Sequence, residues 1–365
     1  MNRAFKFRIY PNSEQEIFFA KTFGCTRFVY NKMLGEKIEY YKETNKMLKN
    51  TPAQYKEEFE WLKEVDSLAL ANAQLHLETA YKNFFRDPKI GFPKFKSKKS
   101  NQFSYTTNNQ NGTIYIKENY IKLPKLKTLV KTKQHREIPE DAIIKSATIS
   151  KTATGKYYIS ILVEIEEEKT ERKVDVNKAI GIDFSMKELI VTSMGTKPDY
   201  PRYYRQAQDK LSKEQRKLSL CEKGSNNRNK QRQKVARLHE KVKNQRQDFL
   251  HKLSRQITNE CDIVCIEDLN MKAMSQCLNF GKSVADNSYG KFVEYLTYKL
   301  DEEGKKLIKI DKWFPSSKTC SNCGRIKEEL LLSERIYSCG CGYIEDRDIN
   351  AAINIRNEGL RIMLA

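Results

Sequence analysis

The sequence predicts a multidomain α/β protein whose first part combines strands with a helical module and whose second part alternates strands with helices. The chain has 365 residues, which exceeds one ordinary hydrophobic core and suits two or three domains. Short segments with a period of two dominate residues 100–170, whereas helical patterns alternate with short apolar strands after residue 176. This change of pattern predicts a domain boundary close to that point.

The first part is expected to be a β-barrel-like platform that carries a helical insertion. Residues 3–10 alternate basic and apolar side chains, as a strand does, and Ser13 with Glu16 resembles a helix capping box directly after that strand. Helical spacings follow, including a run at 67–85. Further strands are expected at 102–107, 113–124 and 142–166, the last a hairpin that turns near Gly155. We therefore assign 1–11 and 90–172 to the β-barrel and 12–89 to the helical module.

The second part, residues 173–365, has an order of elements compatible with a ribonuclease-H-like α/β domain. The segment AIGIDFSMKELIVTS reads as strand, turn and strand, and a polar helical region at about 204–258 is split by the loop 223–230. A strand at 262–269, a helix near 289–303, a strand at 305–311, a cysteine-rich insert at 315–345 and a helix at 349–357 complete the order.

The charge of the chain indicates a polyanionic partner. The formal net charge is +20, from 67 Lys and Arg against 47 Asp and Glu, and every phosphate that is neutralised releases counterions. Nucleic acid is the first candidate, and an anionic membrane surface is the alternative. We find no signal peptide and no apolar run long enough to span a bilayer, so we expect a soluble, intracellular protein with no membrane partner.

Two acidic residues lie in or beside apolar strands. Side chains alternate along a strand, so Asp183 shares its face with Gly181, which would leave open space beside the carboxylate. Glu267 shares its face with Cys265 in the same way. An ionised carboxylate in such a place is costly unless something pairs with it. The alternative is that each acid simply leaves the core where its strand ends.

A third acid is expected in the segment Asp346-Arg347-Asp348. Asp348 directly precedes a run of good helix formers, so it is either a functional acid or the N-cap of the helix. Asp346 could instead be the functional acid, and position along the helix does not decide between them. Three converging carboxylates would suit Mg²⁺ or Mn²⁺ and the hydrolysis of phosphodiesters. The four histidines show no triad-like or metal-binding spacing, and no P-loop or Rossmann fingerprint is present.

The cysteine-rich insert has the spacing of a structural zinc site. Two paired knuckles, Cys320 with Cys323 and Cys339 with Cys341, offer four thiolates for tetrahedral Zn²⁺. A redox role is the alternative, and the paired spacing argues against it. The second knuckle has one residue between its cysteines where the first has two, which makes it a variant ribbon.

Two basic segments are candidate nucleic-acid contacts. The first combines lysines with the aromatic rings of Phe92 and Phe95, a mixture that suits phosphate contact and base stacking. The second surrounds the loop at 223–230. The candidate residues are Lys94, Lys96, Lys98 and Lys99 in the first segment and Arg228, Lys230, Arg232 and Lys234 in the second. For any single lysine, a solvated helix face is the ordinary alternative.

Four blocks, GIDFS, CIEDLN, FPSSKTCSNCG and DRDINAAINI, resemble in order and spacing the signature blocks of the TnpB family. These are transposon-encoded, RNA-guided DNA nucleases related to type V CRISPR effectors. Upstream segments such as AFKFRIYPNSEQE, TFGCTRFVYN and GFPKFKSKK also look like family blocks, so the resemblance covers nearly the whole chain.

The resemblance implies a site for each class of ligand. The RuvC-type nuclease acids fall on Asp183, Glu267 and Asp348, with Mg²⁺ or Mn²⁺ as the metal. The Zn²⁺ ligands of the inserted ribbon fall on Cys320, Cys323, Cys339 and Cys341, although the family usually has two residues in the second knuckle, which would put Ser338 at the third ligand position.

The resemblance also implies an architecture and partners. It implies a wedge-type β-barrel with a helical recognition module ahead of the nuclease domain, in the cytoplasm of a bacterium or archaeon. The expected partners are a guide RNA from the transposon end and double-stranded target DNA beside a short motif. A nuclease-inactive, RNA-guided repressor is the alternative, and it predicts the loss of at least one acid. A transposase that joins DNA strands would require transfer to a 3′ hydroxyl.

Overall fold

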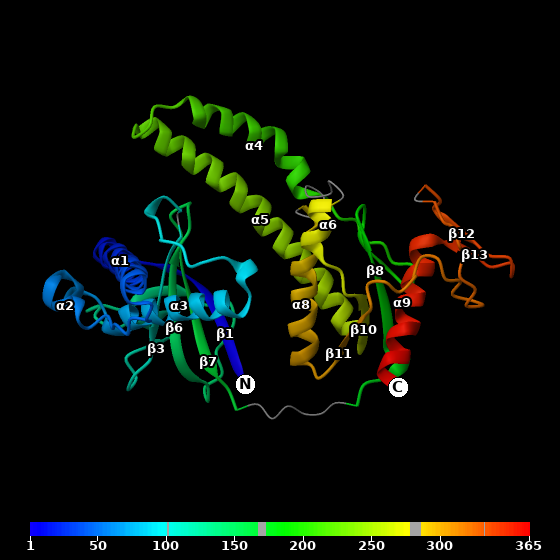
Figure 1. The fold of residues 1–365 in the computed structure, drawn as a ribbon, viewed down its shortest axis with the longest axis horizontal. Helices are drawn as coiled ribbons and strands as arrows, with labels where there is room; N and C mark the ends of the chain where they lie inside the picture. The colour runs from blue at the N-terminus through cyan, green and yellow to red at the C-terminus, as the bar shows by residue number, and fades with distance from the viewer. Residues whose placement is uncertain (101, 167–172, 278–285, 332) are drawn as a thin grey trace. The chain divides into compact units, whose positions relative to one another are not determined.

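The computed structural model describes residues 1–100, 102–166, 173–277, 286–331 and 333–365, and the chain divides into two compact units, Met1–Glu168 and Lys169–Ala365 (Figure 1). The boundary expected between residues 172 and 173 borders residues 167–172, which lie outside the described residues. The finer division of the first unit into a barrel and a helical module remains a prediction. In the described segments, no helix combines the length and apolarity needed to cross a bilayer.

The N-terminal unit contains one antiparallel sheet in the order β2-β6-β7-β1-β5-β4-β3. Its strands are β1 (Asn2–Tyr10), β2 (Phe103–Asn108), β3 (Tyr115–Lys117), β4 (Tyr120–Lys122), β5 (Val130–Lys133), β6 (Ile143–Lys151) and β7 (Tyr157–Glu164). The strands β2 and β3 stand at the two ends of this order, so within the described residues the expected barrel-like sheet is a wedge-like half-barrel. The hairpin expected at 142–166 is confirmed as β6 and β7.

Helices cover one face of this sheet. They are α1 (Ser13–Thr44) and α3 (Ser67–Arg86). The short helix α2 (Tyr55–Glu58) packs with these two helices in a core of its own, and the unit also has the 3₁₀ turns η1 (Glu60–Glu64), η2 (Pro88–Ile90) and η3 (Lys98–Ser100). Phe19 and Phe23 of α1 pack into the sheet core beside Phe5 and Phe7 of β1. The burial of these rings fixes the helix on the sheet because apolar area is removed from water on both sides.

The capping box at the start of α1 lies one residue earlier than expected. Asn12 Oδ1 accepts a hydrogen bond from the Gln15 backbone N–H at 2.9 Å, and the Asn12 N–H donates to Gln15 Oε1 at 3.0 Å. The expected pair, Ser13 with Glu16, is therefore wrong. Asn is as good an N-cap as Ser, and Gln can replace Glu at the third helical position, so the sequence offered both registers.

The C-terminal unit contains a four-stranded sheet in the order β11-β10-β8-β9. Its strands are β8 (Ala179–Ser185), β9 (Leu189–Thr192), β10 (Ile263–Glu267) and β11 (Lys306–Ile310). The pairs β8–β10 and β10–β11 are parallel, whereas β8–β9 is antiparallel. Nearly every residue of β8, β9 and β10 is buried, as expected for strands covered on both faces.

Helices pack on both faces of this sheet. The unit contains η4 (Val176–Lys178), α4 (Tyr203–Leu220), α5 (Asn226–Glu260), α6 (Met271–Cys277), α8 (Tyr289–Glu302) and α9 (Arg347–Leu364), and a two-stranded ribbon of β12 (Ile336–Ser338) and β13 (Ile344–Asp346). One face of the sheet forms a core with α5 and α8, whereas α9 lies along β8 and β10 on the other face (Figure 1). The helices α4 and α5 form the expected helical hairpin.

Candidate active site and cysteine cluster

Asp183 and Glu267 lie at the same edge of the C-terminal sheet. Asp183 is near the carboxyl end of β8, and Glu267 is the last residue of β10. The two strands are parallel and pair Ile182 with Ile266, so the two acids occupy the next position on neighbouring strands. Carboxyl ends of parallel strands meet at one edge of a sheet, which is where ligands commonly bind in open α/β sheets.

The helix α9 lies in direct contact with the backbone of these strands. A Cβ atom on Gly181 would stand 1.9 Å from the carbonyl oxygen of Ala352, and a Cβ atom on Gly359 would stand 2.4 Å from Cys265 Sγ. Two glycines therefore allow the helix and the sheet to approach more closely than any other residue would permit. The open space expected beside Gly181 does not exist, because the backbone of α9 fills it.

The two candidate acids at the start of α9 have different roles. Asp346 is the N-cap: its Oδ1 accepts from the backbone N–H groups of Asp348 at 2.9 Å and Ile349 at 3.2 Å. Its Oδ2 accepts from Lys197 Nζ at 2.6 Å. Burial raises the pKa of Asp346, but these hydrogen bonds outweigh it and the net pKa is lowered. Asp348 is thus in the first turn rather than at the cap.

The electrostatics bring Asp348 together with the two strand acids. Burial raises the pKa of Asp183 well above its ordinary value, and the Glu267 and Asp348 carboxylates raise it further, while Arg347 opposes them. Burial also raises the pKa of Glu267, although the hydroxyl of Ser316 donates to Glu267 Oε1 at 2.7 Å and partly offsets this. The three carboxylates therefore share one partly buried, negatively charged neighbourhood.

The carboxylates of this acidic site are spaced more widely than the ligands of a metal-binding cluster. Within the part of the chain that the structure describes, only the four cysteines bring three or more potential ligand atoms within 4.8 Å of one another. The three acids therefore stand farther apart than the four thiols. Arg347 lies 3.4 Å from Asp348 Oδ1 and balances part of the charge.

Three polar residues of the site were not anticipated from the sequence. Besides Ser316, they are Asn350 and Asn354, which lie one helical turn apart on the buried side of α9. Asn354 Nδ2 donates to the carbonyl oxygens of Ser316 at 2.8 Å and Thr319 at 2.7 Å, and Asn350 Nδ2 also donates to Thr319 at 2.8 Å. Buried amide groups need such hydrogen-bond partners. Two Asn residues at positions i and i+4 of a predicted helix were therefore the sequence signal that could have indicated this contact.

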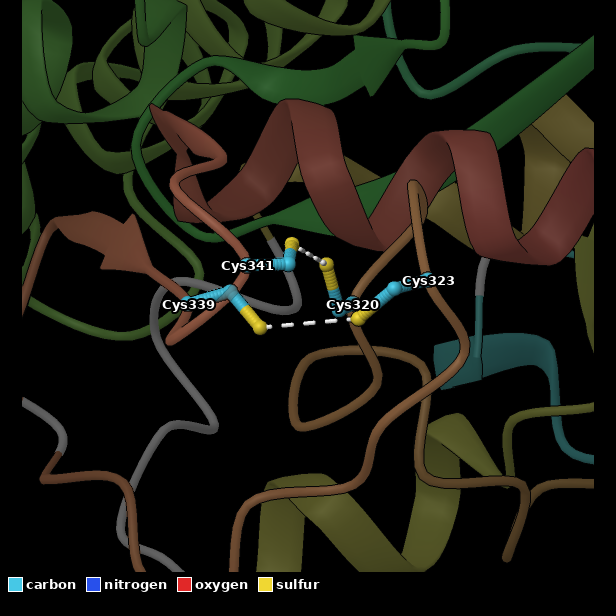
Figure 2. A group of neighbouring side chains, drawn as sticks. All are labelled: Cys320, Cys323, Cys339 and Cys341. Carbon is cyan, nitrogen blue, oxygen red and sulfur yellow. Dashed lines mark hydrogen bonds between the residues drawn. The ribbon is translucent and has the colours of Figure 1, made fainter.

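The four cysteines converge on one point (Figure 2). The Sγ atoms of Cys320 and Cys341 are 3.8 Å apart, and those of Cys323 and Cys339 are 3.7 Å apart. Four thiolates at 2.3 Å from a tetrahedral zinc ion would stand about 3.8 Å from one another, whereas a disulfide brings sulfurs to about 2.0 Å. The four-cysteine cluster therefore suggests Zn²⁺.

The shortened second knuckle still delivers both of its thiols. Gly342 has a φ of 89° and its N–H donates to the Cys339 carbonyl at 3.0 Å, which turns the chain tightly enough for Cys341 to face Cys320. Ser338 instead ends β12, paired with Ile344 in the ribbon. Cys339, rather than Ser338, is thus the third member of the cluster.

The cysteine cluster and the acidic site are joined through α9. The strand β13 ends at Asp346, the N-cap of α9, and the knuckle segment receives the hydrogen bonds from Asn350 and Asn354. In addition, the backbone N–H of Ser321 donates to Asn350 Oδ1 at 3.0 Å. The ribbon therefore holds the first turn of α9, which carries Asp348.

The candidate nucleic-acid residues fall on two separate units. In the first unit all four lysines are exposed, and Lys96 Nζ lies 3.9 Å from the centre of the Tyr30 ring. In the second unit, Arg228 Nη1 donates to the carbonyls of Leu218 at 2.9 Å and Cys221 at 2.8 Å, which closes the turn between α4 and α5. Lys230, Arg232 and Lys234, which lie on α5, are exposed. Contact with nucleic acid remains a prediction for all eight residues.

Three family profiles match the chain. One, described as "Probable transposase" (OrfB of IS605), matches residues 160–278, and another, described as "Cas12f1-like, TNB domain", matches residues 289–355. A third, described as "Helix-turn-helix domain" of the same OrfB type, matches residues 1–46. In this structure those residues form the strand β1 and the single continuous helix α1.

Curated relatives and a solved structure are similar over almost the whole chain. A "Putative RNA-guided DNA endonuclease" of Streptomyces pristinaespiralis is 36% identical over 99% of this chain and 90% of its own length. InsQ of Escherichia coli K12, which has the same description, is 30% identical over 99% and 93%. The Cas12f1 chain of a Cas12f1-sgRNA-target DNA complex shares the fold with a TM-score of 0.64, at 14% identity over 98% and 99% of the two chains. The chain thus belongs to the TnpB family, the OrfB proteins of IS605-type transposable elements.

Proposed function

We propose that this chain is an RNA-guided DNA endonuclease that hydrolyses the phosphodiester backbone with a RuvC-like site formed by Asp183, Glu267 and Asp348. The observation that carries the proposal is the common electrostatic neighbourhood of these acids, which come from β8, β10 and the first turn of α9. A buried carboxyl group whose pKa is raised by burial and by neighbouring carboxylates, as for Asp183, is typical of functional sites. The descriptions of the two full-length relatives support RNA guidance and DNA as the substrate.

The strand order supports a ribonuclease-H-like domain. In the order β11-β10-β8-β9, the first strand of the unit, β8, is antiparallel to the second and parallel to β10. Asp183 and Glu267 stand at the carboxyl ends of β8 and β10, and α9 packs on the face of the sheet that contains Gly181 and Cys265. This arrangement suits a nuclease because side chains from distant segments meet around one edge of a rigid sheet.

The donor set fits a divalent metal ion such as Mg²⁺ or Mn²⁺. Carboxylate oxygens are the ligands that these hard cations prefer. Burial, together with repulsion by Glu267 and Asp348, raises the pKa of Asp183, and a bound cation would offset both effects. When bound, the metal would supply an activated water and stabilise the leaving oxygen. The protein's own contribution is positional: Ser316 orients Glu267, and the N-cap Asp346 sets the first turn of α9 so that Asp348 remains available.

The basic surface suits an RNA and DNA partner. Residues 203–260, which include the hairpin of α4 and α5, contain sixteen Lys and Arg against six Asp and Glu. Such a stripe attracts a phosphate backbone irrespective of its sequence, as guide-dependent recognition requires. We assign one structural Zn²⁺ ion to the four cysteines, and this ion would hold the ribbon against α9.

The alternative function, a nuclease-inactive RNA-guided repressor, predicts the loss of at least one of the three acids. All three acids are present in this chain.

The decisive experiment removes one acid from the intact complex. The chain is purified with its RNA, that RNA is sequenced, and matching DNA is offered with Mg²⁺. Asp183→Ala should abolish cleavage and leave RNA-directed DNA binding unchanged. Asp209→Ala, which removes an exposed acid of α4, is the matched control and should cleave like the wild type.

Full cleavage by the Asp183→Ala variant would contradict the assignment of the site. The products also separate hydrolysis from transposition, because a strand-transfer enzyme would join the cut end to a 3′ hydroxyl of a second duplex.

A further inference from the structure

A tryptophan beside the acidic site is almost completely exposed. Trp313 has 81% of its surface exposed, whereas the other tryptophan, Trp61, is 41% exposed and packs edge-on against Phe28 with ring centres 4.9 Å apart. One exposed apolar side chain needs no explanation by itself, but an indole with lysines beside it has the flat face and the positive charge that bind single-stranded nucleic acid. The Lys312 ammonium lies 5.2 Å from the centre of the Trp313 ring.

The loop that carries Trp313 is attached at both ends to the candidate catalytic acid. On one side, Ile310 pairs with Glu267 in the sheet, and its carbonyl accepts from the Asp268 N–H at 3.1 Å. On the other side, Ser316 donates to Glu267 Oε1 at 2.7 Å. Trp313 stands three residues from each attachment, so at most roughly 10 Å of chain separates it from Ile310 and from Ser316.

A turn within this loop presents the ring outward. Asp311 Oδ1 accepts from the Trp313 N–H at 2.7 Å, and the Asp311 carbonyl accepts from the Phe314 N–H at 3.1 Å. Phe314 packs into the core beneath the loop, beside α9. The backbone is therefore held while the neighbouring indole is left free for a ligand.

A cleft opens beside the same loop. It has a volume of about 690 Å³, and its polar lining residues are Asp268, Asn270, Lys309, Asp311 and Lys312. This volume lies in the range of pockets that take small ligands and single nucleotides. Lys309 pairs with Asp268 at 3.0 Å, but both side chains are exposed, and such pairs contribute little and exchange readily for a phosphate.

We propose that Trp313 stacks on an unpaired base of the DNA strand and thereby positions the adjacent backbone at the acidic site. The two lysines, Lys309 and Lys312, contact the flanking phosphates, and the cleft receives the neighbouring nucleotide. Bases inside a duplex have no free face for an aromatic ring, so the Trp313 ring binds only a strand that is already unpaired. This inference rests on the proposed function and adds to it the residue that holds the unpaired strand beside the acidic site.

Fluorescence tests the contact without reference to cleavage. The chain contains two tryptophans, so Trp61→Phe leaves Trp313 as the single indole of the full-length, RNA-bound protein. Titration with a single-stranded oligothymidylate, without added divalent metal, should quench its emission to saturation. The reciprocal variant, Trp313→Phe, should show no quenching of Trp61. Absence of quenching at Trp313, or equal quenching by a duplex of the same length, would overturn the proposal.

Cleavage tests the consequence of the contact. Trp313→Ala should lower the single-turnover cleavage rate roughly 10- to 100-fold, in line with the loss of one stacked base, and should leave RNA-directed binding of the target intact. Trp313→Phe keeps a stacking face and should retain most of the rate. Leu220→Ala, which truncates an 86% exposed side chain of α4, is the control and should be neutral.

The outcomes separate the two proposals. Wild-type cleavage by Trp313→Ala in a complex that Asp183→Ala inactivates would overturn the role of Trp313 and leave the nuclease assignment intact. A wild-type complex that never cuts DNA would contradict the nuclease assignment, and the fluorescence titration would still decide whether Trp313 binds an unpaired base.

Discussion

The cysteine cluster and the acidic site are both sets of potential metal ligands in the same unit, but they are assembled in different ways. The four cysteines lie between positions 320 and 341, and their sulfur atoms stand within 4.8 Å of one another. The three acids come from positions 183, 267 and 348 and are less closely spaced. Two knuckles and a short ribbon are enough to bring the cysteines together. The acids meet only when two strands and a helix pack on one another.

Because the two sites are assembled differently, different substitutions should disrupt each of them. The cysteine cluster depends on tight turns such as the one at Gly342 and on the pairing of β12 with β13. The acidic site depends on the contact of α9 with the sheet at Gly181 and Gly359. A change in the packing of α9 should therefore damage the acids first and the cysteines last, and the following variants test that order.

The largest effect is expected for the acid at the first turn of α9. Asp348→Asn should lower the single-turnover cleavage rate roughly 1000-fold, because it removes a ligand charge without changing the shape of the side chain. Asp346→Asn should cost only a few-fold, since Asn is an equally good N-cap and only the ion pair with Lys197 is lost. Cleavage assays on matched DNA compare the two variants. The reverse ranking would make Asp346 the functional acid.

The next effect concerns the approach of α9 to the sheet. Gly181→Ala should destabilise the protein by about 3 kcal/mol, because the added methyl group would overlap the Ala352 carbonyl and push the helix away. Cleavage should fall with it, while the zinc content per chain should stay constant. Thermal unfolding and elemental analysis provide the two measurements.

A matched glycine is available as the control for this variant. Gly290 lies in α8, and a Cβ atom there would meet nothing within 4 Å, so Gly290→Ala should be neutral or slightly stabilising. If Gly181→Ala unfolded at the wild-type temperature, the close approach of α9 would be disproved.

A smaller effect on cleavage is expected from the cysteine cluster. Cys339→Ser should reduce the zinc content below the expected value of about one ion per chain and weaken cleavage roughly 10-fold, because the ribbon supports α9 from outside the acidic site. Cys221→Ser changes a cysteine outside the cluster and should retain zinc and activity. Freshly purified wild-type protein without zinc would refute the assignment of the metal.

The smallest expected effect is a pH dependence of the free energy of unfolding, caused by Lys299 on the face of the C-terminal sheet that lies opposite α9. Burial between α5 and α8 lowers the pKa of Lys299 to about 8 from 10.5, and its ammonium donates to the His251 carbonyl and to Ser254 Oγ, both at 2.7 Å. Between these two pKa values the unfolded chain binds more protons than the folded chain. The free energy of unfolding should therefore gain on the order of 1 kcal/mol from Lys299 as the pH rises from 8 to 10.5.

Urea denaturation at pH 8 and pH 10 measures this gain against Lys299→Met, which fills similar space without a charge. The wild type should gain stability relative to the variant as the pH rises. A constant difference would show that Lys299 titrates normally.

The sequence predicted most of the elements that have a strong local period. The strand at 3–10, the helix at 67–85 and the hairpin at 142–166 all exist within a few residues of their expected bounds. It also placed Asp183 and Glu267 at strand ends, because side-chain alternation is a property of a few neighbouring residues. The short strand β5 and the helix α6 were missed, since four to seven residues carry too little periodicity.

By itself, the sequence determined which residue types could bind metal and nucleic acid: a quartet of cysteines, acids after apolar strands and an excess of basic charge. Only the tertiary structure decided that Asp346 caps α9 while Asp348 stands near Asp183, that α9 fills the space beside Gly181, and that the N-terminal sheet stays open. The reason is physical. Periodicity and capping act over a few residues, whereas the meeting of segments 165 positions apart depends on packing that no local pattern encodes.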